Sequence, residues 1–472
     1  MLAQETAQET AFGGGVAFDA TIDCHRPGEP GYRLLLTATV AAAVSVFAAF
    51  YSAQPLIGVL ARHFAIASST ATWAVSLTAL FLGIGMVIAV PMSRRFGRAR
   101  VLKGSAVATA ALATLCALAP TWPALLVLRA LLGLSAAGTP AVALAYIREE
   151  VHPLFHPRAS GIYIGGAGLG AMAGRVVAGG VVALAGWRWS FGAIALLSGL
   201  CALVVTGCLP APRYAGSHEA SAETRAESIA SADAATNDVG AFWRALCGRR
   251  LLALYVTGAV LMGAVMAVYD VLALRLSAPE FGLTLFAASF AFCDFPIGSA
   301  GSVIGGHLAE RFGHPRVILL GGGVAAIGLL ITLSHSLPLV ILGVAVFIFG
   351  FFAAHGVASG WAATLGHQVN ATSQASTVYM LAYYIGGSLF GAVGAALWVR
   401  AGWPAVVAVG VGLCLTAAGI GTVLLAGSRR TVNFSKPKWR TVSKSALRRR
   451  RTPSPRDLSG VLLDRRIANK LW

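Results

Sequence analysis

The sequence contains few charged residues. Only 11% of its 472 residues are Asp, Glu, Lys or Arg, whereas soluble proteins carry roughly 25%. Hydrophobic residues make up 57% of the chain, and the mean hydropathy is +0.74. This scarcity of charge argues against a string of soluble domains and indicates a polytopic α-helical membrane protein. The 55 glycines agree with that class, because glycine is frequent in membrane helices.

Cysteine and metal-ligand patterns are also sparse. The seven cysteines are scattered, most lie inside apolar runs and no CxxC occurs, so they predict neither a disulfide framework nor a metal site. His152 and His156 lie four residues apart without an evident third ligand. No GxxxxGK[ST] sequence is present, so direct use of ATP is not expected. We therefore expect no metal and no cofactor.

Twelve apolar runs fill most of the chain. They lie near residues 34–54, 71–91, 101–119, 123–147, 159–184, 189–209, 251–276, 284–306, 316–334, 338–360, 375–398 and 404–426. Each is close to the ~20 residues with which a helix crosses a bilayer core. Because backbone polar groups cannot remain unpaired in lipid, each run is predicted to form a transmembrane helix.

The segments between the runs predict the domains and the orientation. We expect a cytoplasmic lead at 1–32, a six-helix bundle at 33–209, a cytoplasmic linker at 210–250, a second six-helix bundle at 251–426 and a basic cytoplasmic tail at 427–472. With this arrangement, 30 of the 36 Lys and Arg residues fall inside and four fall outside. The positive-inside rule therefore favours a multi-pass protein of a bacterial-type inner (plasma) membrane, with both termini cytoplasmic.

A short basic turn occurs once in each half of the chain. The first turn contains Arg94, Arg95, Gly97 and Arg98, and the second contains Glu310, Arg311 and Gly313. Three further landmarks recur in the same order, 216 to 221 residues apart: Tyr51 and Tyr269, the Tyr-Ile-Gly-Gly sequences that begin at Tyr163 and Tyr384, and the Gly-Trp pairs at Gly186 and Gly402. The chain is therefore predicted to be a duplicated six-helix unit. The expected fold is all-α, with twelve transmembrane helices in two pseudo-symmetric bundles around a central cavity, an architecture typical of transporters.

Three motifs resemble those of the major facilitator superfamily. The first basic turn resembles G-x-L-x-D-R-x-G-R-R, the segment 129–133 resembles R-x-x-x-G, and the segment 170–175 resembles the glycine-rich antiporter motif. Together with 383–387 and Gly402-Trp403, they make residues 33–426 similar to the bacterial twelve-helix branch of drug and metabolite proton antiporters. The resemblance implies a secondary transporter rather than an enzyme, with a small-molecule substrate and protons as the coupling ion.

Two positions depart from the family pattern. Arg94 stands where the family's first turn carries an acid, and Arg175 stands where the antiporter motif has a proline. The resemblance implies that this acid pairs with basic groups across the bundle and holds the outward-facing state. Glu310, in the second turn, is therefore the better candidate for a conformational lock, while both basic turns brace the ends of their helices.

Only two acidic residues fall within the apolar runs. A charge at mid-bilayer costs at least ~2.5 kcal/mol, so such a residue usually faces a cavity. Asp294, about halfway along its run, is the main candidate for a proton carrier, and Asp270 is the second. The alternatives are a structural ion pair or a polar helix contact for Asp294, and a solvated helix end for Asp270.

Aromatic, amide and basic residues in the runs are candidates for the substrate cavity. They are Tyr51, Gln54, Arg129, Arg175, Tyr379 and Tyr383. Aromatic and amide groups suit an amphipathic ligand, although tyrosine is also typical of membrane interfaces. Arg129 either binds an anionic substrate, pairs with an acid during proton exchange or extends towards an interface. Arg175 either lines the cavity or pairs with Asp294.

Glycines recur every four residues in two runs, at Gly166, Gly170 and Gly174, and again at Gly387 and Gly391. This spacing puts them on one helix face and lets another helix approach closely. We expect both helices to meet partners from the opposite half.

The sequence leaves three functional hypotheses. The first is proton-coupled efflux of a small amphipathic compound or metabolite by alternating access, and the second is a proton symporter that imports a small organic anion. A non-transport membrane sensor or enzyme is a remote third, because neither polar clusters at a membrane face nor an appended signalling domain is evident. The cluster Arg448–Arg451 in the tail suits anionic lipid. No nucleic-acid partner is expected, and the protein is expected to be a monomer.

Overall fold

The computed structural model describes residues 24–210, 246 and 248–434. In these ranges the chain is helical apart from loops and one isolated β-bridge. The first half contains α2 (Pro30–Tyr51), η1 (Gln54–Leu56), α3 (Ile57–His63), α4 (Ser68–Ala71), α5 (Trp73–Phe96), α6 (Arg98–Ala117), α7 (Trp122–Ala136), α8 (Gly138–Glu150), η2 (Pro153–Phe155), α9 (His156–Ala185) and α10 (Trp187–Cys208). The second contains α14 (Arg249–Ser277), α15 (Leu285–Ser289), η3 (Phe290–Phe292), α16 (Phe295–Phe312), α17 (His314–Ile331), α18 (Leu337–Gln368) and α19 (Thr372–Phe434).

The described helices cross a membrane as often as the sequence predicts. Eleven of them are long and apolar enough to span a bilayer, and the last, Thr372–Ala426, has 55 residues. That last helix contains non-helical backbone at Gly402, where two helices meet at a kink. Counting its two parts separately gives twelve crossings, which confirms the predicted fold class.

Glycines at four matched positions mark the duplication in the backbone. Gly97 and Gly313 close the two basic turns with φ of 90° and 88°, and Gly186 and Gly402 precede the two tryptophans with φ of 84° and 71°. L-residues with a side chain rarely adopt such angles, so glycine is needed at each turn. We call the end of the bundle that carries Gly97 and Gly313 the basic-turn end, and the end with Gly186 and Gly402 the tryptophan end.

Two runs predicted as single helices are interrupted by 3₁₀ turns, and a third, the run at 123–147, divides into α7 and α8 at Ala137. The run at 34–54 ends as α2 at Tyr51 and continues as η1 and α3, and the run at 284–306 divides into α15, η3 and α16. Pro55 and Pro296 follow the two breaks, because proline lacks an N–H and its ring clashes with the preceding turn. The breaks place irregular backbone inside the protein, where side chains can satisfy it.

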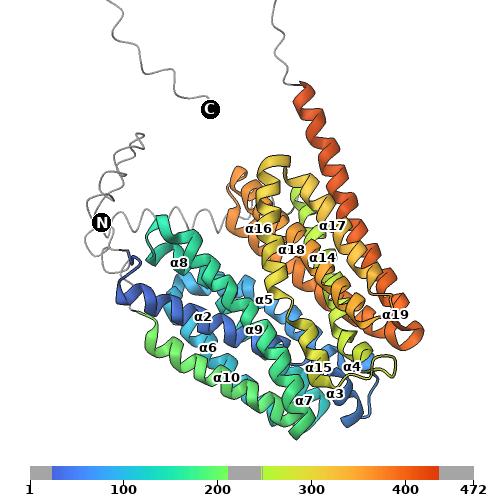
Figure 1. The fold of residues 1–472 in the computed structure, drawn as a ribbon. Helices are drawn as coiled ribbons and strands as arrows, with labels where there is room; N and C mark the ends of the chain where they lie inside the picture. Colours follow the sequence, from blue (N-terminus) through green and yellow to red (C-terminus); the bar gives the residue numbers. More distant parts are fainter. Residues whose placement is uncertain (1–23, 211–245, 247, 435–472) are drawn as a thin grey trace, which may run out of the picture. The chain divides into compact units, whose positions relative to one another are not determined.

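Packing is densest within each half, and a few elements join the halves. The helix α2 packs on α9 and α10, α6 packs on α10, and α18 packs on α14, α16 and α17. Across the halves, α9 contacts α15 and α16, and η1 contacts α14 (Figure 1). The main hydrophobic core draws residues from both halves, such as Leu82 and Leu261. The contacts of α9 and η1 therefore set the position of the site described below.

The glycine faces lie mainly against their own half. A Cβ at Gly170 or Gly174 would come within 2.7 Å of α2 backbone atoms, and one at Gly166 would contact Val40 of α2. Gly387 faces the side chains of Met262 and Met266 of α14, and Gly391 faces Asp270 and Met266 of the same helix. The contact with the opposite half lies further along α9, where Gly179 and Gly180 face α15. The prediction of close approach is confirmed. Both helices also meet the opposite half, α9 through α15 and α16, and α19 where Tyr384 lies beside Gly83 of α5, but mainly on faces other than those of their glycines.

Candidate coupling and substrate site

The two halves meet at a polar cluster built at the breaks in their helices. Gln54 begins η1, directly after the break in α2, and Asp294 directly precedes the first residue of α16. Arg175 comes from α9, which contacts the second half, and Asp270 comes from α14. Tyr51, the last residue of α2, completes the cluster. The structure thus brings together both predicted acids and three of the six predicted cavity residues.

Gln54 joins an arginine of the first half to an acid of the second. Its Oε1 accepts a hydrogen bond from Arg175 Nε at 2.6 Å, and its Nε2 donates to Asp270 Oδ1 at 2.7 Å. Arginine can only donate, so the amide must turn its oxygen to Arg175 and its NH₂ group to the carboxyl group. Gln54 and Asp270 are each only 1% exposed, which shields this bridge from solvent.

Asp294 is held by a residue that the sequence reading did not select. Tyr269 donates its hydroxyl hydrogen to Asp294 Oδ2, and the aspartate remains half-buried. Within the described residues no ion pair joins Asp294 to Arg175, so that alternative is not realised in this structure. The sequence could have indicated Tyr269 as a site residue, because it occupies the position in the second half that matches Tyr51.

Aromatic rings surround the guanidinium group of Arg175. Its central carbon lies 3.8 Å from the ring centre of Tyr51, 5.0 Å from that of Phe292 and 5.5 Å from that of Tyr269. Separations below about 6 Å are those of cation–π contacts. Arg175 therefore sits between the two acids in an aromatic enclosure, and Gln54 is its side-chain hydrogen-bond partner.

The second oxygen of Asp270 has a different environment. Asp270 Oδ2 is buried and has no hydrogen-bond partner among the described residues, and the same holds for Ser76 Oγ. Both lie beside Gly391, where a Cβ would be 2.6 Å from Oδ2 and 3.6 Å from Oγ. Gly391 therefore makes room for the carboxyl group in addition to packing on α14.

A row of aromatic residues leads from the cluster into the second half. Phe50 lies 6.3 Å from Tyr384 between ring centres, Tyr384 lies 5.1 Å from Tyr383, and Tyr383 lies 4.6 Å from His355. The row ends where His355 Nδ1 and the hydroxyl group of Tyr379 share a hydrogen bond of 2.9 Å. The predicted residues Tyr379 and Tyr383 therefore belong to this row, and His355 joins them. Within the described ranges no group of three or more His, Cys, Asp or Glu residues is placed to hold a metal ion.

Comparisons with known proteins identify the family of the chain. A family model described as the Major Facilitator Superfamily matches residues 39–390 and 272–467. The chain belongs to the major facilitator superfamily. The Bacillus subtilis (strain 168) relative "Uncharacterized MFS-type transporter YybF" is 30% identical over 386 residues, which cover 81% of this chain and 91% of the relative. The Escherichia coli (strain K12) relative "Inner membrane transport protein YnfM" is 31% identical over 380 residues, which cover 80% and 87%.

A solved structure shows the same superfamily fold. It is the crystal structure of a bacterial homolog to the human lysosomal transporter Spinster, in an inward-facing and occupied conformation. The TM-score is 0.62 at 16% sequence identity, and the match covers 84% of this chain and 95% of that chain. Members of the superfamily are secondary transporters of small molecules, so this chain is a multi-pass membrane transporter and not an enzyme.

Arg129, which carries the superfamily's R-x-x-x-G resemblance, lies apart from the central cluster. It is 1% exposed and donates to three backbone oxygens: Nε to Ala74 at 2.9 Å, Nη1 to Ala49 at 2.9 Å and Nη2 to Phe50 at 2.8 Å. Ala49 and Phe50 belong to the last turn of α2, where the break leaves carbonyl groups without helical partners. The geometry favours a brace for the broken helix over a substrate ligand.

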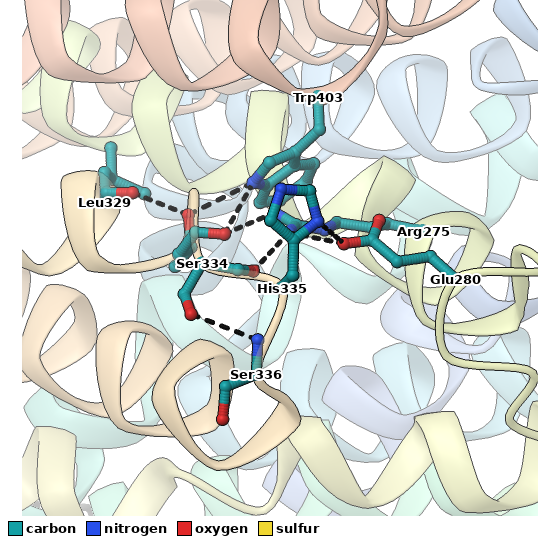
Figure 2. A network of polar contacts seen from close by, with 8 residues as sticks. Arg275, Glu280, Leu329, Ser334, His335, Ser336 and Trp403 are labelled. Atoms are coloured by element: carbon teal, nitrogen blue, oxygen red, sulfur yellow. Dashed lines mark hydrogen bonds and ion pairs between the residues drawn. The ribbon is translucent and has the colours of Figure 1, made fainter.

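Arg275 performs a comparable task at the tryptophan end of the second half (Figure 2). It donates Nη1 to Thr332 O at 2.5 Å and Nη2 to Ser334 O at 3.0 Å, just beyond the end of α17. Trp403 Nε1 donates to the same Thr332 O at 3.1 Å, and the guanidinium group lies 4.5 Å from the Trp403 ring centre. Glu280 Oε1 lies 2.7 Å from His335 Nδ1 and 4.0 Å from Arg275 Nη2. Sequence reasoning placed Arg275 in an outer loop, so this anchor was missed.

The two basic turns differ in their contacts. Arg98 forms an ion pair with Glu149 at the end of α8, with Nη2 and Oε1 2.8 Å apart. Arg95 and Arg311 each lie over the phenylalanine that follows them, at 5.5 and 5.3 Å. Glu310 is exposed, and no ion pair of Glu310 occurs among the described residues. The brace predicted for the first turn thus has a visible partner, whereas the lock predicted at Glu310 has none in this conformation.

Proposed function

We propose that the protein is a proton-coupled exporter of a small amphipathic compound that works by alternating access. The observation that supports this most strongly is the cluster in which Asp294 and Asp270 of the second half lie on either side of Arg175 of the first half. A buried acid that exchanges a proton changes its attraction to a neighbouring arginine. Because the arginine and the acids come from different halves, that change acts directly on their junction.

The two acids differ in exposure, and we assign them different roles. Asp294 is half-buried and bonded through Tyr269, so it is the acid that exchanges protons with the aqueous side. Asp270 is enclosed and joined to Arg175 through Gln54, so it holds the arginine in place. The aromatic row beside them offers flat apolar faces and a few hydroxyl groups, which suit an amphipathic substrate.

We propose that both termini are cytoplasmic, as the distribution of Lys and Arg favours, so that the basic-turn end faces the cytoplasm. The halves meet near the tryptophan end, through α9 with α15 and η1 with α14. This is the arrangement of an inward-facing transporter, the state of the solved Spinster homolog. The first residues of the predicted tail, up to Phe434, continue α19, and the rest lies outside the described residues. Contact of the basic tail with anionic lipid is part of this proposal.

Transport by purified protein in proteoliposomes with an imposed pH gradient tests the proposal. Panels of dyes and organic acids serve as substrates. We expect Asp294→Asn to abolish proton-driven transport. Exchange of substrate in the absence of a pH gradient should continue. Glu280→Gln, which removes an acid at the tryptophan end, is the matched control and should retain coupling. Intact proton-driven transport by Asp294→Asn would show that another group carries the proton.

A second candidate is a proton symporter that imports a small organic anion. It is favoured by Arg175, whose guanidinium group lies between the halves with no carboxylate ion pair among the described residues. The sign of the pH change inside vesicles separates the two functions. Acidification of the lumen together with substrate uptake identifies symport, and alkalinisation identifies exchange.

A further inference from the structure

A groove lies on the outside of the first half, away from the central cluster. It has a volume of about 840 Å³, follows α10 and is bordered at one end by the last turn of α6. Its walls and floor include Thr114, Leu118, Gly192, Leu196, Gly199 and Leu203. A Cβ at either glycine would meet nothing within 4 Å, so the floor is open rather than filled by a neighbouring helix. The groove is apolar along its length.

The groove extends along most of α10. Its lining on that helix runs from Arg188 to Leu203, which at 1.5 Å per residue is about 22 Å. This exceeds half of the ~30 Å hydrocarbon thickness of a bilayer. Since α6 and α10 are both membrane spans, the groove opens into lipid and has the length and direction of an acyl chain.

The tryptophan end of the groove is cationic. Arg188 lines it there, and its one hydrogen bond within the described residues is from Nη2 to Ala119 O at 3.3 Å. The guanidinium group lies 4.3 Å from the ring centre of Trp187, and Arg188 as a whole is exposed. The only acids between residues 33 and 209 are Glu149 and Glu150, at the far end of α8. An anion bound at Arg188 would therefore not be repelled by a negatively charged residue of this half.

We propose that this groove binds one chain of an anionic phospholipid, with the phosphate group at Arg188. The planar guanidinium group matches phosphate oxygens with paired N–H donors. Trp189 lies in the groove, 69% exposed, at the level where tryptophan side chains meet lipid headgroups. The lipid would cover the apolar floor along α10 and leave the central cluster free. This site is independent of the substrate and the coupling ion.

Quenching of Trp189 fluorescence by phospholipids with brominated chains tests the site. The full-length protein is titrated in mixed micelles with brominated phosphatidylglycerol or brominated phosphatidylcholine. The signal of Trp189 is the difference between the native protein and Trp189→Phe. We expect phosphatidylglycerol to quench at about fivefold lower mole fraction than phosphatidylcholine, because Arg188 adds the attraction of one cation to anionic lipid. Equal quenching by both lipids would overturn the proposal.

Three variants separate the groove from general lipid contact. Arg188→Gln should bring the two lipids to equal potency, and Gly199→Leu, which fills the floor, should weaken quenching by both. Gly207→Leu is the control, because Gly207 is on the same helix and faces open space outside the groove. Unchanged thermal unfolding in each variant shows that the fold is retained. A preference for phosphatidylglycerol that survives Arg188→Gln would contradict the assigned phosphate position.

Discussion

Arginine serves two different purposes in this transporter, and its acceptors distinguish them. Arg129 and Arg275 donate to backbone carbonyl groups at helix ends, where such groups lack helical partners. Arg175 instead donates to the side chain of Gln54, close to two acids. Arg129 and Arg175 lie inside apolar runs and Arg275 lies at the end of one, and the sequence does not distinguish their roles. Only the position of the helix breaks decides which arginine meets carbonyl groups and which meets an ionisable network.

The hydroxyl group of Tyr269 should matter for coupling. We predict that Tyr269→Phe slows proton-driven transport by about tenfold, because a hydrogen bond to a charged group contributes about 1.5–3 kcal/mol. The ring remains, so the contact with Arg175 is kept. Tyr163→Phe is the control, since the Tyr163 hydroxyl group is buried without a partner among the described residues. If both variants transport alike in the vesicle assay, Tyr269 does not position Asp294.

Arg129 should act on stability rather than on substrate. Lysine cannot reach three separated carbonyl groups, so we predict that Arg129→Lys lowers the free energy of unfolding by about 2 kcal/mol. Denaturation in detergent measures this loss, with the exposed Arg94→Lys as the control. The KM for substrate should stay within about twofold of the native value. A large change in KM at unchanged stability would mean that Arg129 binds substrate.

At the scale of helices, sequence patterns predicted lengths well and interruptions poorly. The apolar runs matched the described spans because hydropathy reports burial in lipid. The breaks at Pro55 and Pro296 were missed, since a proline in a membrane helix either kinks it or ends it depending on the groups nearby. Both Gln54 and Asp294 owe their place in the cluster to these breaks. The candidate residues were therefore predictable, but their contacts were not.

The contact between α9 and α2 depends on the absence of a side chain at Gly174. A Cβ there would lie 2.7 Å from Ala48 Cα, and backbone atoms cannot rotate away. We predict that Gly174→Ala lowers the free energy of unfolding by about 1–3 kcal/mol through overpacking. Gly165→Ala is a matched control on the same helix, because its Cβ would meet open space. Equal melting temperatures for the two variants would mean that α9 can move away from α2.

At the scale of the whole molecule, the duplicated halves have become electrically unequal. The first half supplies Arg129 and Arg175 to the interior, while the second supplies Asp270 and Asp294. The sequence predicted the duplication. It indicated Gln54 as a cavity residue, but it could not predict which groups Gln54, Tyr269 and Gly391 contact, because those contacts depend on how the halves are docked. The cluster exists only where the halves meet, so any movement between them must change it.

The contact of α9 with α15 should open during each transport cycle. A Cβ at Gly179 would lie 2.9 Å from Ser289 Cβ, slightly closer than the 3.5–4.5 Å of a disulfide, so a small shift lets two cysteines join. We predict that Gly179→Cys with Ser289→Cys, in a background without the seven native cysteines, loses at least about 90% of its transport on oxidation. Reductant should restore it, because the bond would hold the tryptophan end closed. Gly179→Cys with the native Ser289 keeps a γ atom at both positions and cannot cross-link, so its transport should not change on oxidation. Full transport by the cross-linked protein would mean that the halves do not separate at this contact.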